Sequence, residues 1–406
     1  MKKILFTSPI MEYPAAGGPQ LRIENTVRVL CRLADVHIFS RTSPSQMGDQ
    51  SALNFYKNLA SNLEIAPSMQ RTIWRRIRSK IDFLCGTLWN FKVDCWRLQH
   101  YIQKNNIEIL WCGFGNISYP LIAEMRRCMP QLKIVCDTDS VWSRFVLRGL
   151  SVEKDNERRT AIETEGYAKE QEEKLFVDIS DVTTAVSEED ASYYRSITTH
   201  PEKVHICSNV INLDTYAIHH APPPNFHVPA IFLGGSYGDV HSPMGWAAQW
   251  VVHEVMPIVW EQYPQAHLYL VGRGSDQYCT DLVGERVSAT GKLPTVLPYL
   301  QNAAVSIVPL QFESGTRFKI LESGACGIPI VSTSLGAEGI PVTHGQELLL
   351  ADNPRDFAQA ILLLLTDPDR GRQLATACRA MVEQDYCLKS LEREISRILE
   401  YLALHN

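Results

Sequence analysis

The chain has 406 residues, more than one ordinary hydrophobic core supports, and suits two α/β domains of similar size. Its net charge of −6 argues against general nucleic-acid binding. No stretch reaches the roughly 18 apolar residues that span a bilayer, and the basic residues at 2–3 lack a signal-peptide pattern. The eleven cysteines show no metal-ligand spacing, and Cys112, Cys136 and Cys207 lie in apolar runs. We therefore expect a cytoplasmic protein with reduced core cysteines, without a zinc site or disulfide framework.

The first part of the chain alternates strand and helix patterns. Residues 2–9 and 36–40 predict strands, and a glycine-bearing loop and a helix lie between them. Gly17 and Gly18 allow close backbone approach at the start of this helix. Arg22 follows where the helix dipole does not favour a cation, so it serves either a ligand or solvent. The repeated order predicts a doubly wound parallel sheet with ligands at the strand ends.

A basic amphipathic segment covers residues 71–91. Apolar side chains recur there at helical spacing among five basic ones: Arg71, Arg75, Arg76, Arg78 and Lys80. Such a helix can lie on an anionic membrane, or it can face the core with a solvated basic side. The apolar stripe slightly favours the core, whereas the arginines keep peripheral membrane contact open.

Two carboxylates follow the strand predicted at 133–136. Asp137 and Asp139 would lie at the carboxyl end of a parallel strand, where active sites collect. The alternative is a polar turn in which Asp139 or Ser140 caps the next segment. Residues 152–174 are strongly charged and predict a solvated helix face.

The domain boundary is predicted at residues 213–229. This range contains His219 and His220 and then three prolines, which indicate an extended linker. Adjacent histidines without a carboxylate cluster do not predict a metal site. The domains would then be 1–212 and 230–387, with a final amphipathic helix in 388–406.

The central motif of the second half joins two predicted strands, 304–309 and 328–333, through one short helix. Ser314, Gly315 and Thr316 open this helix. A strand, a glycine-bearing loop and a helix N-terminus make an anion site, because the first helical N–H groups lack partners.

Charged residues continue the same motif. Arg317 and Lys319 add positive charge at the helix start, and the Glu322 carboxylate can accept hydrogen bonds from two adjacent hydroxyls. Phosphate donors beside a ribose-sized acceptor suggest a nucleotide site. The alternative is that Lys319 and Glu322 form an exposed pair three residues apart.

Several motifs together resemble glycosyltransferase family four, of the GT-B fold. They are Gly17-Gly18 with Arg22, 209–212 (NVIN), 232–235 (FLGG), 270–274 (LVGRG), 291–294 (GKLP) and 315–322 (GTRFKILE). The resemblance implies two Rossmann-like α/β domains facing a cleft, with the nucleotide sugar on the C-terminal domain and the last helix crossing back to the first. It also implies sugar transfer with retention of configuration and no metal in the nucleotide site.

Carried onto these residues, the family implies that Glu322 binds the ribose and that Arg317 and Lys319 face the diphosphate. Gly17 and Gly18 would approach the same phosphates, and the donor site would include Gly235, Glu313, Ser314, Gly315 and Thr316. Asp139 would lie near the donor sugar or the acceptor.

Three positions depart from the family pattern. Ser314 stands where a second glutamate is common, with Glu313 shifted by one, and Asp139 stands where a histidine is common. The usual arginine–lysine pair is absent from 234–244.

The resulting expectation is a retaining glycosyltransferase that uses a UDP-sugar or GDP-sugar without a cofactor or metal. The acceptor would be a glycan, a lipid or a small molecule. Two alternatives remain open: a nucleotide-sugar epimerase of the same fold, and a non-catalytic protein that binds nucleotide sugars.

Overall fold

The computed structural model describes residues 2–15, 17–42, 47–48, 50–65, 88–315 and 318–405. The chain forms two compact units, and each is built from segments that are distant in sequence. The first unit contains Met1–Val141, Lys169–Cys207 and Leu391–Asn406, and the second contains Trp142–Ala168 and Ser208–Ser390.

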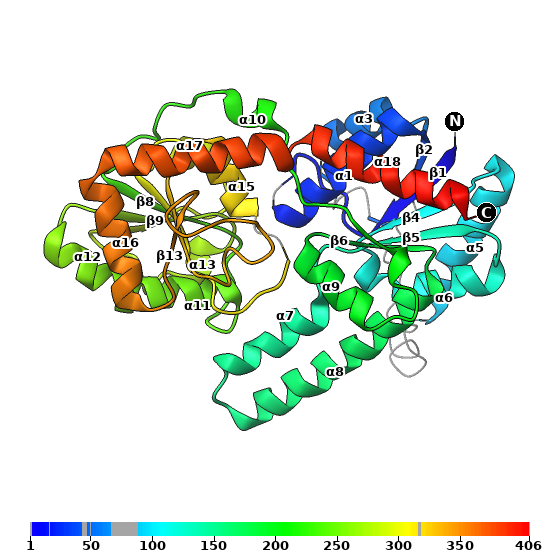
Figure 1. The fold of residues 1–406 in the computed structure, drawn as a ribbon, viewed down its shortest axis with the longest axis horizontal. Helices are drawn as coiled ribbons and strands as arrows, with labels where there is room; N and C mark the ends of the chain where they lie inside the picture. Colours follow the sequence, from blue (N-terminus) through cyan, green and yellow to red (C-terminus); the bar gives the residue numbers. More distant parts are fainter. Residues whose placement is uncertain are drawn as a thin grey trace, which may run out of the picture. The chain divides into compact units, whose positions relative to one another are not determined.

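The first unit holds a parallel sheet of seven strands in the order β3-β2-β1-β4-β5-β6-β7. Figure 1 labels β1, β2, β4, β5 and β6 of this sheet. Its strands are β1 (Lys3–Ser8), β2 (Asp35–Ser40), β3 (Asn62–Ile65), β4 (Ile109–Gly113), β5 (Lys133–Asp137), β6 (Val182–Ala185) and β7 (Val204–Ile206). Its helices are α1 (Gly18–Leu33), α3 (Gln50–Leu59), α5 (Leu88–Asn105), α6 (Tyr119–Cys128) and α9 (Glu188–Ser196), with parts of α8 (Asn156–Ile179) and α18 (Leu388–Leu404).

The second unit holds a parallel sheet of six strands in the order β10-β9-β8-β11-β12-β13. The strands are β8 (Ala230–Gly234), β9 (His267–Val271), β10 (Val287–Ala289), β11 (Val305–Val308), β12 (Ile330–Ser332) and β13 (Leu349–Leu350). The α-helices are α7 (Trp142–Arg148), α10 (Leu213–Ala217), α11 (Pro243–Trp250), α12 (Met256–Gln262), α13 (Ser275–Tyr278), α14 (Leu297–Leu300), α15 (Phe318–Ala325), α16 (Pro354–Thr366) and α17 (Pro368–Asp385), besides the start of α8.

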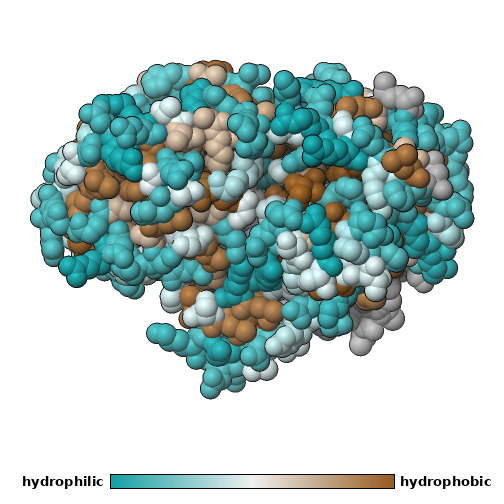
Figure 2. Space-filling model, viewed as in Figure 1, coloured by the Kyte–Doolittle hydropathy of each residue, from teal (hydrophilic) through white to brown (hydrophobic). Residues whose placement is uncertain are grey.

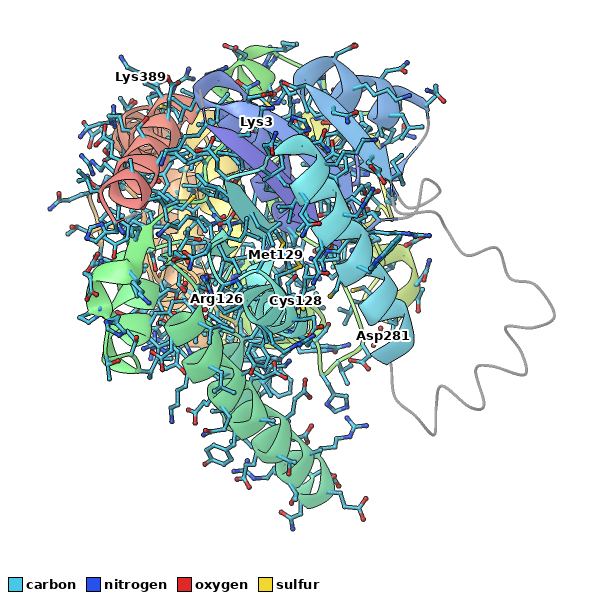
Figure 3. All side chains as sticks on the ribbon, turned by 90° about the vertical axis from the view of Figure 1, so that its right-hand side faces the viewer. Lys3, Arg126, Cys128, Met129, Asp281 and Lys389 are labelled. Carbon is cyan, nitrogen blue, oxygen red and sulfur yellow. The ribbon has the colours of Figure 1, made fainter. Side chains whose placement is uncertain are left out.

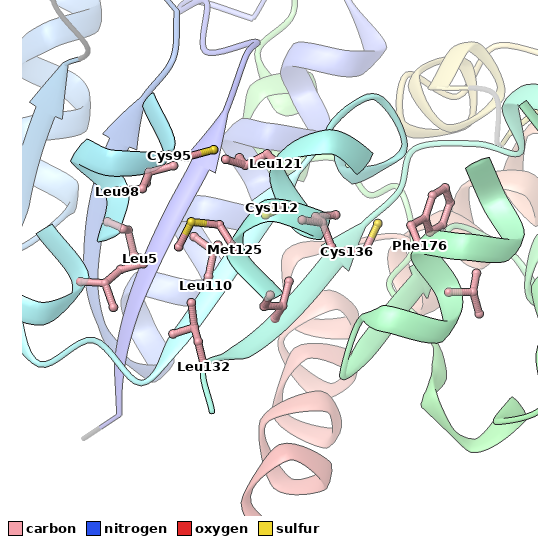
Figure 4. Close-up of a cluster of buried hydrophobic side chains, with 14 of the residues drawn as sticks. Leu5, Cys95, Leu98, Leu110, Cys112, Leu121, Met125, Leu132, Cys136 and Phe176 are labelled. Atoms are coloured by element: carbon pink, nitrogen blue, oxygen red, sulfur yellow. The ribbon is translucent and has the colours of Figure 1, made fainter. Parts of the chain in front are cut away.

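The core of the first unit shows why these residues form a parallel sheet. Leu5, Leu110 and Ile134 lie in register on β1, β4 and β5 and point to one face. Met125 of α6 and Phe176 of α8 cover this face (Figure 4). Because both faces of a parallel sheet are covered, its central strands are apolar almost throughout.

Polar contacts at the amino-terminal ends of β5 and β6 hold helix α6 in place. Arg126, labelled in Figure 3, donates to the carbonyl of Ile179 at 2.9 Å and pairs with Asp181. The Asp181 carboxylate also accepts from the N–H of Ile134 at 2.7 Å. Arg126 therefore links α6, through Asp181, to the starts of β5 and β6.

The prediction that Cys112, Cys136 and Cys207 lie in the core is confirmed, because all three are buried. Ser187 accepts from the N–H of Asp190 at the start of α9, and Gly327 has φ +69° after α15. The range 213–229 was predicted to be an extended linker, but it begins with the short helix α10 (Leu213–Ala217). Asn212 caps this helix. Within the described part of the chain, no helix has the length and apolar character needed to cross a membrane.

Candidate functional site

Glycine-bearing loops meet at the carboxyl ends of the strands in the second unit. The N–H of Gly235, after β8, donates to the carbonyl of Val271 at the end of β9 at 2.9 Å. Gly272 has φ +127°, and a Cβ there would lie 2.1 Å from the carbonyl oxygen of Gly235. A side chain at Gly272 is therefore excluded, and the two loops pack backbone against backbone. In parallel sheets this edge is where ligands bind.

The loop between β11 and α15 completes this edge. Gly315 has φ +84°, a left-handed conformation that favours glycine, and Ser314 beside it is buried. Helix α15 is described from Phe318, so the predicted phosphate ligands Thr316 and Arg317 lie outside the described residues. Strand, glycine loop and helix follow one another as predicted.

Glu322 is held by a residue that the sequence analysis missed. The hydroxyl of Tyr216, on α10, donates to Oε1 of Glu322 at 2.9 Å. Burial raises the pKa of Glu322, while this hydrogen bond and the charge of Lys319 act in the opposite direction. Lys319 and Glu322 are both half-buried. Glu322 thus has a fixed orientation, which a freely solvated helix pair would lack.

Arg148 is a second residue that local patterns do not reveal. Its guanidinium donates to the carbonyl oxygen of Glu313 at 2.7 Å and to both carboxylate oxygens of Glu338 at 2.6 and 2.8 Å. Glu313 directly precedes the loop residues Ser314 and Gly315, and Glu338 lies in the turn after β12. The half-buried arginine therefore joins two loops at the same edge of the sheet.

The remaining predicted site residues belong to the first unit. Gly17 has extended backbone geometry before α1, and its carbonyl accepts from the N–H of Leu21 at 3.0 Å. Gly18 is the first residue of α1, with Pro19 in the first turn. Asp139 follows β5, is half-buried, and accepts from the side-chain amide of Asn116 at 2.6 Å. All three positions follow carboxyl ends of strands in their own sheet.

Arg22 does not face solvent, so that part of the prediction is wrong. Its side chain is 2% exposed, pairs with Asp137 and donates to the carbonyl of Cys207 at 2.8 Å. Burial lowers its pKa, but the charge of Asp137 and the hydrogen bond to it outweigh this effect, so the pKa of Arg22 is raised. The arginine stays charged inside the unit and ties α1 to β5 and to the end of β7.

Asp137, the last residue of β5, and Asp139, two residues later, consequently differ in role. Besides pairing with Arg22, Asp137 accepts from Trp111 Nε1 at 3.0 Å and from the Thr184 hydroxyl at 2.8 Å. It is fully buried. Asp139 keeps partial exposure, so it is the carboxylate of this pair that a ligand can reach.

The charged segment 152–174 is more than a solvated helix face, contrary to the prediction. Glu173 is 1% exposed and accepts from the Tyr193 hydroxyl at 2.6 Å. A Cβ at Gly166 would lie 2.4 Å from the Leu147 side chain, so α8 packs closely on α7 there. The predicted membrane segment, 71–91, lies largely outside the described residues.

Residues 236–367 match the family model described as "Glycosyl transferases group 1". The D-inositol 3-phosphate glycosyltransferase of Thermobispora bispora is 34% identical over 87 residues, which cover 21% of this chain and 20% of that protein. A GDP-mannose-dependent monoacylated alpha-(1-6)-phosphatidylinositol monomannoside mannosyltransferase of Corynebacterium glutamicum is 27% identical over 161 residues, or 36% and 42% of the two chains. The chain therefore spans less than half the length of these curated relatives.

Similarity to solved structures extends over both units. The sucrose-phosphate synthase of Thermosynechococcus elongatus matches with a TM-score of 0.72 at 16% identity, covering 100% of both chains. HepE of Anabaena in complex with UDP and glucose matches with a TM-score of 0.66 at 12% identity, covering 98% of this chain and 100% of the other. Two parallel α/β sheets with these structural relatives show the GT-B fold.

Proposed function

We propose that this chain transfers a sugar from a nucleoside-diphosphate sugar to an acceptor hydroxyl, with retention of configuration. The observation that carries the proposal is the edge of the second sheet. There, close-packed glycine loops and the Tyr216–Glu322 pair lie at or beside the segment that matches the group 1 glycosyltransferases.

Each part of this edge has a task in the proposed reaction. Backbone N–H groups near Gly235 and Gly315 suit phosphate, because glycine lets a ligand approach the backbone closely. Glu322, oriented by Tyr216, would accept hydrogen bonds from the ribose hydroxyls. Arg317 and Lys319 would balance the charge of the diphosphate.

The reaction exchanges one bond at the anomeric carbon. The bond from this carbon to the phosphate oxygen breaks, and a bond to the acceptor oxygen forms on the same face. The acceptor proton passes to the departing diphosphate, so the mechanism needs no nucleophile from the protein. Negative charge grows on the leaving group, and Arg317 and Lys319 would stabilise this charge most strongly in the transition state. Asp139 would orient the sugar or the acceptor.

The relatives support two donor classes. HepE was solved with UDP and with UDP-glucose, and the mannosyltransferase of Corynebacterium glutamicum depends on GDP-mannose. The same relative acts on a phosphatidylinositol mannoside, so a glycolipid acceptor is included with glycans and small molecules. We propose UDP- or GDP-sugars as donors, bound without a metal.

Thermal-shift measurements with UDP, GDP, ADP and their sugars identify the donor. Calorimetry then compares Glu322→Ala with Glu261→Ala, which removes an exposed carboxylate from α12 in the same unit. Loss of charged hydrogen bonds to the ribose should weaken binding by about 2–3 kcal/mol in the first variant only. Equal affinity of the two variants would remove Glu322 from the donor site.

Product analysis separates the proposed reaction from its alternatives. Glycosyl transfer yields a sugar-modified acceptor and free nucleoside diphosphate. An epimerase would convert the donor without an acceptor, and a binding protein would leave it unchanged across a broad acceptor panel. Either of these results would contradict the proposed function.

A further inference from the structure

The hairpin segment, residues 142–168, follows β5 in the chain but belongs to the second unit. It comprises α7, the short 3-10 turn Gly149–Ser151 and the first part of α8. In Figure 2 this hairpin is hydrophilic along its outer edge and carries a hydrophobic area as well. Its contacts with loops of the second sheet include hydrogen bonds and ion pairs.

Three loops at the carboxyl edge of the second sheet touch the hairpin segment. Arg148 contacts Glu313 after β11 and Glu338 after β12. Glu153 lies 3.3 Å from Nδ1 of His241, in the loop after β8. The loops after β8 and β11 contain residues of the proposed donor site, so the hairpin holds this site from outside the sheet.

The contacts of Arg148 are of a strong type. The guanidinium meets the Glu338 carboxylate with two parallel hydrogen bonds, and both side chains are 24% exposed. Isolated ion pairs on the surface contribute little, but bidentate and partly buried pairs have fixed geometry and contribute more. The same arginine also fixes a backbone carbonyl next to Ser314.

Contacts within the hairpin hold its turn and its two helices together. Nη1 of Arg159 donates to the carbonyls of Leu150 and Glu153 at 2.7 and 2.9 Å and so closes the turn. Beyond the turn, Gly166 lets α8 pack directly on Leu147 of α7. Arg148 therefore projects from a braced element.

We propose that Arg148 is a positioning residue for the donor site, which holds the loops after β11 and β12 in the conformation that receives the diphosphate. This inference rests on the proposed function. Arg148 acts through the Glu313 carbonyl and the Glu338 carboxylate and contacts no reacting atom.

Hydrogen–deuterium exchange tests the support without any ligand. Arg148→Ala and Arg148→Lys should raise amide exchange in the loops after β11 and β12 by about tenfold or more, the alanine variant most, because charged hydrogen bonds are lost. Lys154→Ala removes an exposed charge from the same hairpin and should leave both loops unchanged. Wild-type exchange in both loops of Arg148→Ala would overturn the proposal.

A reversed pair separates the two contacts. In Arg148→Glu with Glu338→Arg, the ion pair can form again, but a glutamate cannot donate to the Glu313 carbonyl. Protection of the loop after β12 should therefore return, while the loop after β11 stays exposed to exchange. If the loop after β12 stays unprotected in the reversed pair, although its circular dichroism spectrum is normal, a direct contact between residues 148 and 338 would be contradicted.

Kinetics separate positioning from loss of folded protein. If Arg148 supports the loops equally in the donor complex and in the transition state, its replacement weakens both by the same amount. Arg148→Lys should then raise the donor KM severalfold with little change in kcat. A lower kcat at unchanged KM would instead indicate less folded enzyme and overturn the positioning role. If the wild-type chain binds no nucleotide sugar, the proposed function fails, and the exchange experiment still decides whether Arg148 holds the loops.

Discussion

At the scale of single residues, the hydrogen bond from Tyr216 to Glu322 controls both orientation and ionisation. Burial raises the pKa of Glu322, and the Tyr216 hydroxyl opposes this rise. A carboxylate accepts ribose hydroxyls best when it is ionised. Tyr216 therefore supports the proposed role of Glu322 in two ways.

Tyr216→Phe should weaken donor binding by about 1 kcal/mol, and more strongly at low pH, because loss of the hydroxyl raises the pKa of Glu322 further. Calorimetry at pH 5.5 and pH 8 measures this difference. Tyr278→Phe alters an exposed tyrosine of the same unit and provides the control. An equal affinity loss at both pH values would show that ionisation of Glu322 is not involved.

His267 offers a residue-scale test of stability. Burial, with the charge of the stacked His227 ring at 4.6 Å, lowers its pKa to about 4 from 6.5. The unfolded chain therefore binds a proton between these two values that the folded chain does not. The contribution of His267 to the free energy of unfolding is therefore fully present above about pH 6.5. It falls as the pH drops toward 4, by up to about 3 kcal/mol.

His267→Gln should reduce this pH dependence, since glutamine can still bond to the Ser288 hydroxyl that His267 meets at 2.8 Å. Scanning calorimetry at pH 7.5 and pH 5 measures the change. His253→Gln replaces an exposed histidine in the same unit and should behave as wild type. If His267→Gln loses as much stability between pH 7.5 and pH 5 as the wild type, the pH dependence does not come from His267.

These residues show where sequence reasoning reached its limit. The types and order of residues in 309–333 predicted strand, loop and helix, because local propensity determines them. The partners of Glu322 and Glu313 are 106 and 165 residues distant, at Tyr216 and Arg148. No local period marks such pairs, and only the tertiary fold brings them together.

At the scale of elements, sequence patterns did not predict the short strands at three sheet edges. β3, β10 and β13 occupy three of the four edges. Edge strands are short and partly exposed, so they lack the apolar run that identifies a central strand. The glycine loops and helices between central strands were predicted because they alternate regularly.

Helix α1 is attached to its sheet by a buried charge, and this attachment can be measured. Arg22→Met leaves the Asp137 carboxylate buried without its counter-charge, which should cost about 3–5 kcal/mol of unfolding free energy. Arg32→Met, on the same helix, changes an arginine that is 54% exposed and should cost less than about 1 kcal/mol. Urea denaturation compares the two variants.

Adding Asp137→Leu to Arg22→Met removes the unpaired charge. The double variant should be destabilised by less than the sum of the single changes, because each single change leaves one buried charge alone. Strict additivity would mean that the two side chains do not interact energetically.

At the scale of the whole molecule, each unit is assembled from separate stretches of chain. Residues 391–406 belong to the first unit, and α18 supplies four nearly inaccessible side chains: Leu391, Ile395, Ile398 and Leu402. At about 1.5–3 kcal/mol each, their burial contributes roughly 6–12 kcal/mol, comparable with the stability of a domain.

Deletion of 391–406 should therefore prevent stable folding of the first unit. Ile395→Ala is the milder test and should lower its unfolding free energy by about 2–5 kcal/mol, whereas Glu400→Ala, exposed on the same helix, should not. Exchange of amides in β1 and β4 reports on this unit. Wild-type protection there after the deletion would show that α18 is dispensable.

The late contribution of α18 also has a consequence for biosynthesis. All seven strands of the first sheet have been translated by Ile206, but the helix that completes its core follows only after Ser208–Ser390. During that interval the nascent chain presents the apolar surface that Ile395 and Ile398 later cover. We therefore expect the ribosome-bound intermediate to bind chaperones until residues 391–406 emerge and displace them.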